Sequence, residues 1–227
     1  MKLVVFDVDG TLVDSQHMIV AAMDCAFAAI GAQPPSRQET LSIVGLSLRE
    51  AMQALTGADQ STIDSLTESY KAAFFELRSD PAHNEPLYPG ADHVLDQLSA
   101  RDDVLLGIAT GKSRRGVDRV LERFDLQGRF VTIQTADNHP SKPHPAMLFE
   151  ALSESGIDAA RAVMIGDTVF DMEMASAAKI PAIGVAWGYH DAAHLRPAGA
   201  LHVADDYPHL LRLLDAQFND APGEDRT

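Results

Sequence analysis

The stretch MKLVVFDVDGTLVDS, residues 1–15, decides the fold and raises a physical problem. Its apolar residues 3–6 suit a short buried strand, yet two acids, Asp7 and Asp9, follow directly. Alternate side chains of a strand point the same way, so these carboxylates are expected close together at the end of the strand. At ~4 Å and an effective dielectric constant of about 20, they repel each other by about 4 kcal/mol. The sequence therefore predicts a cation or a proton between them.

The composition narrows the class of protein. The 227 residues are 46% hydrophobic and 22% charged, which is typical of a globular protein with one core and room for a smaller second unit. The net charge of −15 argues against a nucleic acid or an anionic membrane as partner. A single cysteine, Cys25, excludes an internal disulfide and is expected to be a buried, inert thiol. The short apolar start predicts neither a signal peptide nor a membrane span, so we expect a cytoplasmic protein.

Helical patterns fill the next part of the chain, residues 14–87. Apolar residues recur at helical spacing in residues 15–31, which end at Gly31, and in residues 61–79, which are followed by Pro81. Two capping-box spacings predict further helix starts, at Ser36 with Glu39 and at Ser47 with Glu50. We therefore expect a helical insertion after the first strand.

From residue 88 onward, strand and helix patterns alternate. The strand-like apolar runs are residues 104–110, 161–167, 180–188 and 200–206. The helical stretches between and beside them are residues 91–100, 114–123, 145–155 and 169–178. Buried parallel strands have continuous apolar runs of this kind, and the alternation is typical of a sheet with helices on both faces.

These patterns predict an α/β fold with two units. A doubly wound parallel-sheet core is expected to comprise residues 1–13 and 88–218. Residues 14–87 are expected to form an inserted α-helical cap. The polar residues 219–227 are expected to form a flexible tail.

Polar side chains follow three of the predicted strands where each strand ends. In open parallel sheets ligands bind at the carboxyl ends of the strands, so these groups are expected to meet at one edge. They are Asp7, Asp9, Thr110, Asp167 and Asp171, with Lys142 from a loop. Carboxylates suit Mg²⁺, while a hydroxyl and an ammonium suit phosphate oxygens. The set predicts phosphoryl chemistry, but spacing does not say which carboxylate has which role.

Four motifs in order resemble the haloacid dehalogenase superfamily of phosphotransferases, over nearly the whole chain. They are DVDGT at residues 7–11, Thr110 in IATGK, Lys142 in SKPHP, and GDTVFD at residues 166–171. The helical insertion resembles the helical cap of that family. The most similar subgroup is the phosphoglycolate-phosphatase-like hydrolases.

The resemblance implies a role for each acid. Asp7 would be the nucleophile that becomes an aspartyl phosphate, and Asp9 would protonate the leaving group and then activate water. Mg²⁺ would be held by the Asp7 carboxylate, the Asp9 backbone carbonyl and Asp167. Asp171 would support this shell and orient Lys142. Dehalogenation does not need the second acid, so Asp9 favours phosphate chemistry.

The resemblance also implies the groups that bind the substrate. The phosphoryl group would be bound by Thr110, Gly111 and Lys142. Gly111 stands where many members have Asn, which predicts altered contacts while the backbone N–H remains. Three more residues are candidate substrate contacts: Gly45, Arg49 and Lys112. A turn with a helix start is the equal alternative for the first two, and a solvated helix start for the third.

The function expected from this resemblance is Mg²⁺-dependent hydrolysis of a small phosphorylated metabolite such as phosphoglycolate. The alternatives are a sugar phosphomutase, an inorganic pyrophosphatase and a non-catalytic phosphate-binding protein. Against the mutase, Ile19 lies where a histidine is expected. Asp14 and Ser15 are expected to cap the first cap helix, and Trp187 and Tyr189 to serve in packing. A homodimer is left open.

Overall fold

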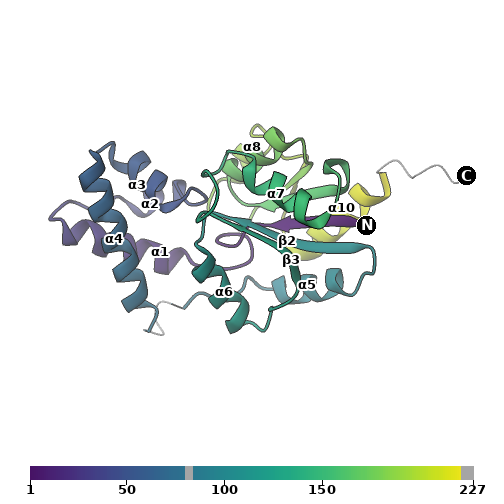
Figure 1. The fold of residues 1–227 in the computed structure, drawn as a ribbon, viewed down its shortest axis with the longest axis horizontal. Coiled ribbons are helices and arrows are strands. Elements are labelled where there is room, and N and C mark those ends of the chain that lie inside the picture. Colours follow the sequence, from purple (N-terminus) through teal and green to yellow (C-terminus); the bar gives the residue numbers. More distant parts are fainter. Residues whose placement is uncertain (80–83, 221–227) are drawn as a thin grey trace, which may run out of the picture.

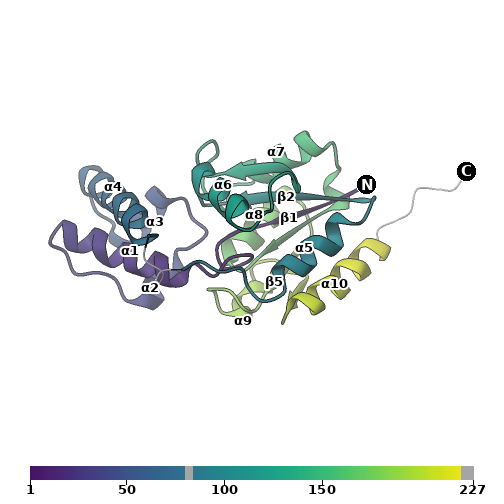
Figure 2. The same ribbon diagram turned by 90° about the horizontal axis from the view of Figure 1, so that it is seen from below.

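The structure, a computed structural model, describes residues 1–79 and 84–220. A group of helices lies beside an α/β unit, as Figure 1 shows from one side and Figure 2 from below. The helices come from the first third of the chain, and the α/β unit contains the first strand and everything after the helices. The predicted fold class, a doubly wound parallel-sheet core with an inserted helical cap, is confirmed.

Six parallel strands form the sheet in the order β3-β2-β1-β4-β5-β6. They are β1 (Lys2–Phe6), β2 (Val104–Thr110), β3 (Phe130–Thr135), β4 (Ala162–Gly166), β5 (Ala182–Val185) and β6 (His202–Ala204). The chain winds outward from β1 in one direction through β3, and in the other from β4 through β6. The reversal lies between β1 and β4, and in such sheets the ligand crevice lies at this reversal.

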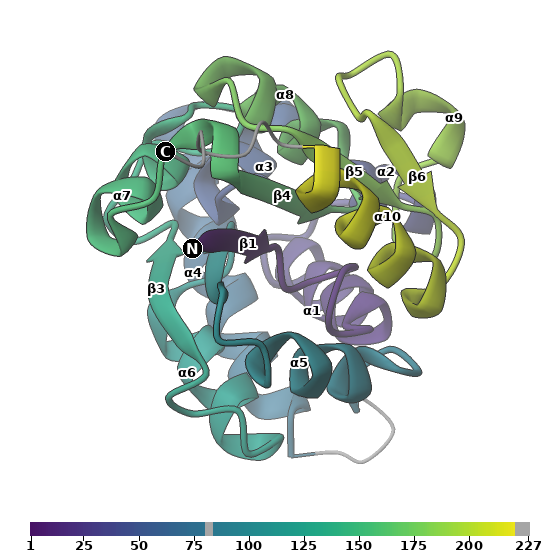
Figure 3. The same cartoon turned by 90° about the vertical axis from the view of Figure 1, so that its right-hand side faces the viewer.

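Helices cover both faces of the sheet (Figure 3). They are α5 (Ala91–Ser99), α6 (Arg114–Arg123), α7 (Ala146–Ser155), α8 (Val169–Ala178), α9 (Ala192–Leu195) and α10 (Tyr207–Asp220), with a short 3₁₀ helix at Ala159–Arg161. Val4 and Phe6 of β1 pack with α5, α6 and α10, whereas Leu3 and Val5 pack with α7, α8 and α9. Because both faces are buried, every position of this strand after Lys2 must be apolar.

Besides the one-turn helix α9 and the 3₁₀ helix, two longer elements of the core were not predicted from the sequence, β3 and α10. In β3 the side chains of Thr132 and Gln134 turn inward and donate to Glu154 of α7, at 2.6 and 2.7 Å, so the strand has no apolar run. In α10 the buried side chains recur every three or four residues, and Pro208 lies in the first turn, where a helix tolerates it. The helix extends two residues into the predicted tail, and residues 221–227 lie outside the described part.

The cap helices are α1 (Gln16–Ala29), α2 (Arg37–Ser42), α3 (Leu48–Thr56) and α4 (Gln60–Leu77). They enclose a small apolar core of their own, made of Met23, Ala26, Phe27, Met52, Ile63 and Leu66. Pro81, the predicted end of the last cap helix, lies outside the described residues. In the part of the chain that the structure describes, no helix has both the length and the apolar character needed to cross a bilayer.

Two predictions about the cap are settled by side-chain positions. The capping box of Ser36 and Glu39 is confirmed, but Ser47 makes no such cap, because its hydroxyl donates to the Glu50 carboxylate. Cys25 was expected in the core, and this was wrong: it is exposed. The buried positions of α1 fall in pairs that end with Ala26 and Phe27, which places Cys25 on the solvent side.

Candidate active site

The loop after β1 carries the first two acids and turns the chain toward the cap. The backbone N–H of Asp7 donates to the Ile165 carbonyl at 2.9 Å, which fixes Asp7 beside the end of β4. The next residues form a tight loop in which Gly10 has φ +86°. A Cβ at Gly10 would lie 2.2 Å from Oδ2 of Asp167, so only glycine lets the loop approach this carboxylate.

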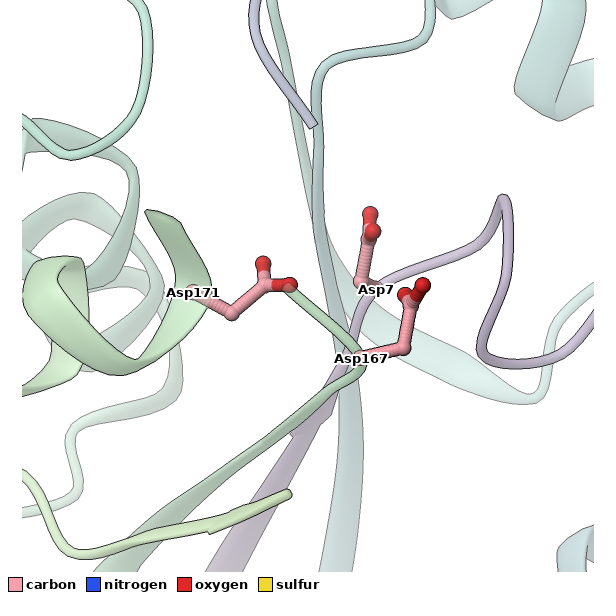
Figure 4. A group of neighbouring side chains, drawn as sticks. All are labelled: Asp7, Asp167 and Asp171. Atoms are coloured by element: carbon pink, nitrogen blue, oxygen red, sulfur yellow. The ribbon is translucent and has the colours of Figure 1, made fainter. Parts of the chain in front are cut away.

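Asp7, Asp167 and Asp171 form a buried acidic group (Figure 4). Their nearest carboxylate oxygens all lie within 4.8 Å of one another, and the three residues come from the ends of β1 and β4 and from the first turn of α8. Burial raises the pKa of Asp7 to about 6, with Asp171 and Asp9 adding to the rise and Lys142 opposing it. Burial, followed by the charges of Asp171 and Asp7, also raises the pKa of Asp167 well above its usual value.

Lys142 places a positive charge next to this acidic group. Its Nζ donates to Asp171 Oδ1 at 2.6 Å and lies 3.0 Å from Asp7 Oδ1. Burial lowers the pKa of Lys142, but the charges of Asp171 and Asp7 outweigh burial and the net direction is upward. The side chain is therefore a positive charge held beside the acids by its hydrogen bond to Asp171.

The remaining oxygens of the acidic group differ in their hydrogen bonds. Asp171 Oδ2 accepts from the backbone and the hydroxyl of Thr168, at 3.0 and 2.7 Å. Asp167 accepts from the Thr11 hydroxyl at 2.9 Å and from the backbone N–H of Tyr189 at 2.8 Å. Asp7 Oδ1 is buried without a hydrogen-bond partner, because the nearby Lys142 lacks the required alignment. Three acids, one ammonium and an oxygen without a donor make a group that fits a divalent cation.

Asp9 lies outside this acidic group and has its own cation. Its Oδ1 accepts from the Ser15 hydroxyl at 2.6 Å and from Lys112 Nζ at 2.8 Å. Lys112 also reaches Glu85 at 3.3 Å. Burial lowers the pKa of Lys112, but Asp9 and Glu85 outweigh burial and raise it. The sequence predicted one cation or proton between the two acids, whereas each acid has an ammonium of its own, Lys142 for Asp7 and Lys112 for Asp9.

The end of β2 brings Thr110 and Gly111 to the same edge. Thr110 is buried, and its hydroxyl accepts from the backbone N–H of Lys112 at 3.2 Å. A Cβ at Gly111 would lie 2.7 Å from the backbone carbonyl oxygens of both Gly45 and Leu46. The cap loop therefore approaches the core at a point where a side chain has no room. This contact gives a physical reason for glycine at position 111, where many members of the family that the sequence resembles have asparagine.

A cleft of about 820 Å³ separates the cap from the core. Most of the predicted site residues line it, namely Asp7, Asp9, Gly45, Arg49, Thr110, Gly111 and Lys112. Lys142, Asp167 and Asp171 lie beside Asp7 and are not part of the lining. Arg49 is partly exposed and pairs with Asp64 on the neighbouring helix α4.

Four residues that contact the site were missed, most of them because they bind partners in distant parts of the chain. Ser15 was expected to cap α1, but its hydroxyl donates to Asp9 and makes no cap. Tyr189 was expected only to pack, yet its hydroxyl lies 3.0 Å from Ser15 Oγ and its N–H donates to Asp167. Thr11, which binds Asp167, stands in the DVDGT motif but was given no role, and Glu85, which binds Lys112, carries no signal in the sequence that marks it.

Comparison with known proteins identifies the family. The haloacid dehalogenase-like hydrolase family matches residues 4–185. The protein named "Probable phosphatase IndB" from Dickeya dadantii is 32% identical over 213 residues, which cover 92% of this chain and 91% of that protein. A phosphoglycolate phosphatase from Rhodospirillum rubrum is 31% identical over 216 residues, with 92% and 89% covered.

A solved structure agrees with these relatives. The crystal structure of a hydrolase from Pseudomonas syringae is 27% identical and superposes with a TM-score of 0.84. The similarity covers 95% of this chain and 99% of that one. The family match and the relatives span the core, the cap and all four motifs. The chain belongs to the haloacid dehalogenase-like hydrolases and is an enzyme of the phosphatase type.

Proposed function

We propose that this hydrolase cleaves a small phosphate monoester through an aspartyl phosphate and depends on Mg²⁺. The observation that carries the proposal is the buried acidic group, in which Asp7 lines the cleft and its Oδ1 has an ion pair with Lys142 but no aligned hydrogen bond. Phosphoglycolate is the leading candidate substrate, a choice supported by the name of the Rhodospirillum rubrum relative. The cytoplasmic location stays a prediction from the sequence.

The acidic group supports the metal. Asp7, Asp167 and the backbone carbonyl of Asp9 would hold Mg²⁺, while Asp171 keeps Lys142 in place through the hydrogen bond of 2.6 Å. When bound, Mg²⁺ would neutralise charge on the phosphoryl oxygens. The orphan oxygen of Asp7 and the excess of carboxylates over ammonium groups favour this assignment.

In the first step, a carboxylate oxygen of Asp7 attacks phosphorus and the bond from phosphorus to the ester oxygen breaks. The product is an aspartyl phosphate on Asp7, and the leaving alkoxide takes a proton from Asp9. Lys142, the Thr110 hydroxyl and the backbone N–H of Gly111 would bind the phosphoryl oxygens during the transfer.

In the second step, a water molecule attacks phosphorus and the bond to Asp7 breaks. Asp9 takes the proton of that water, which restores both acids and releases inorganic phosphate. Ser15 and Lys112 both donate to Oδ1 of Asp9 and so would orient the carboxylate for both proton transfers. We assign residues 14–87 to a cap that closes over this chemistry and excludes bulk water.

The test is phosphate release from a panel of small phosphate esters, with Mg²⁺ and with a chelator. We expect turnover by the wild type only with the metal, and none by Asp7→Asn. Asp102→Asn is the matched control, because it makes the same change at an exposed position of the α/β unit. A further Asp9→Asn variant should bind phosphate esters and Mg²⁺ but release almost no phosphate.

Other outcomes would select among the alternatives. Transfer of phosphate between hydroxyls of a phosphosugar would identify a mutase, and release from pyrophosphate alone would identify a pyrophosphatase. No release from any ester by folded wild-type protein with Mg²⁺ would overturn the proposal and leave phosphate binding. Equal turnover by wild type and Asp7→Asn would exclude the aspartyl phosphate.

A further inference from the structure

We propose that Arg115 and Arg119 of α6 bind a second anionic group, carried by the leaving group of the substrate. The preferred substrate is then a phosphate monoester with a carboxylate or a second phosphate several carbon atoms from the ester oxygen. This inference rests on the proposed phosphatase function and adds its substrate class. It is based on the lysine and arginine side chains that line the cleft, because some of them have a carboxylate partner and others do not.

Five lysine and arginine side chains line the cleft, and carboxylates already hold three of them. Their ion pairs are Arg49 with Asp64, Lys71 with Glu68, and Lys112 with Asp9 and Glu85. Arg115 and Arg119 make no ion pair within residues 1–79 and 84–220. They are therefore the lining cations left available to an incoming anion.

A third arginine adds positive charge to the same place. Arg78, at the end of α4, has its guanidinium carbon 3.7 Å from the ring centroid of Phe75, and Arg115 lies 5.7 Å from the same centroid. Arg78 Nη1 is buried and has no hydrogen-bond partner among the described residues. Two guanidinium groups thus lie near one aromatic ring, and the charges of both act on Arg119.

The electrostatics of Arg119 agree with this placement. Desolvation comes first among the causes that lower the pKa of Arg119, and the charges of Arg78 and Arg115 follow. Glu122 and Glu85 oppose the shift without forming an ion pair with Arg119 in the described structure. Like charges held this close destabilise one another, and a bound anion would relieve the repulsion.

Arg115 and Arg119 line the same cleft as Asp9, the acid that would protonate the leaving group. Lys112, which binds Asp9, has its Nζ 5.4 Å from the ring centroid of Phe74, and the adjacent Phe75 faces Arg115. The aromatic pair of α4 therefore spans from Lys112 to the arginines. Arg119 is one helical turn beyond Arg115, a rise of about 6 Å. A leaving group that extends from Asp9 to these arginines is expected to be longer than glycolate, so this inference replaces phosphoglycolate, the candidate taken from the name of a relative, with a longer ester.

The experiment uses three esters with the same four-carbon chain. One ends in a hydroxyl (4-hydroxybutyl phosphate), one in a carboxylate, and one in a second phosphate. We expect the wild type to favour one or both anionic esters over the neutral one by roughly tenfold or more in kcat/KM, the scale of a charged hydrogen bond. The better anionic ester then distinguishes a carboxylate from a phosphate.

The variants assign that preference to the arginines. Arg115→Gln with Arg119→Gln should remove the preference and leave kcat/KM for the neutral ester within about twofold. Arg114→Gln is the matched control, because Arg114 lies on the same helix, pairs with Asp118 at 2.8 Å and is not part of the cleft lining. It should keep the full preference.

Two results would overturn the inference while the phosphatase function stands. One is a wild type that does not distinguish the three esters, and the other is an equal loss on all three in the double variant. If no ester is cleaved, the proposed function fails separately. Calorimetric binding of the four-carbon bisphosphate then tests the arginines alone, and an affinity that is unchanged in the double variant would refute their role.

Discussion

The acidic group with Lys142, which adjoins the cleft through Asp7 and is here called the floor, and the cap wall of the cleft hold ion pairs of opposite character. In the floor, the Lys142 side chain is 0% exposed and its partners Asp7 and Asp171 are 1% and 0% exposed. In the cap, the pair of Arg49 with Asp64 is 45% and 54% exposed. A buried pair is costly to break, whereas an exposed one contributes little to stability.

This difference suggests separate roles for the two regions: the floor for the chemistry and the wall for substrate preference. The floor is fixed by packing and hydrogen bonds from three elements, so its geometry does not depend on the substrate. The cap wall carries charges that can change with little loss of stability. Substrate preference can therefore change at the wall while the chemistry of the floor stays the same.

The largest effect is expected from the floor. Asp7→Asn removes the proposed nucleophile, so kcat should fall by roughly 10⁴-fold or more. The protein should stay folded, because the change removes a buried charge from a group with excess carboxylates. Steady-state phosphate release and a thermal melt check both parts. Residual activity within tenfold of the wild type would contradict the role of Asp7.

The contrast in stability can be measured with one substitution at two places. Lys142→Met leaves Asp7 and Asp171 without their ammonium, and the free energy of unfolding should fall by about 3 kcal/mol or more. Lys71→Met breaks the exposed pair with Glu68, and the loss should stay below about 1 kcal/mol. Urea unfolding measures both. Similar losses would mean that the two regions do not differ as described.

The pH dependence of stability without metal sharpens the same contrast. The pKa of Asp7 is raised from 3.8 to about 6, first by burial, so the folded state binds this proton more tightly than the unfolded chain. The stabilisation from this proton is therefore complete below pH ~4 and is lost as the pH rises through about 6. Urea unfolding between these values, with a chelator, should show the decline. In Asp7→Asn this part of the slope should vanish.

A smaller effect is expected where the two regions meet. Gly111→Ala places a methyl group against the carbonyls of Gly45 and Leu46, so the cap loop must move away. KM should rise several-fold with a smaller change in kcat, and amide hydrogen exchange near residue 45 should become faster. An unchanged KM would show that this contact is not needed for binding.

The smallest effect is expected on the outer face of the cap. Cys25 is exposed, so a thiol reagent should label it in the native protein without denaturant. Labelling should leave phosphatase activity and the melting temperature nearly unchanged, because α1 buries its other face. Protection of the thiol until the protein unfolds would contradict its exposed position.

Sequence patterns predicted the core well because its strands are buried on both faces. The apolar runs before Asp7, Thr110 and Asp167 therefore marked the strands, and their ends marked the site. Strand β3 was missed because its inward Thr132 and Gln134 are satisfied by a carboxylate from α7, a tertiary contact without a local signal.

The partners of the acids could not be predicted for a similar reason. Lys112 was expected as a substrate contact, yet it binds Asp9 and Glu85, which lie 103 and 27 residues away in the chain. Local spacing also did not reveal that the Ser15 hydroxyl turns to Asp9. The shape of the cleft depends on how the cap helices pack on one another and on the core, which no local pattern specifies.

The central strand of the sheet is also the first to leave the ribosome. β1 pairs Lys2 with Val104 on one side and Leu3 with Ala162 on the other, so neither neighbour exists when it is made. Such distant pairing makes folding slow, and the apolar segment stays exposed until β4 is complete. A circular permutation that joins the two ends and opens the chain just before α5 would make β1 after both of its neighbours, and it should therefore reduce the demand for chaperones, with the same sheet at the end.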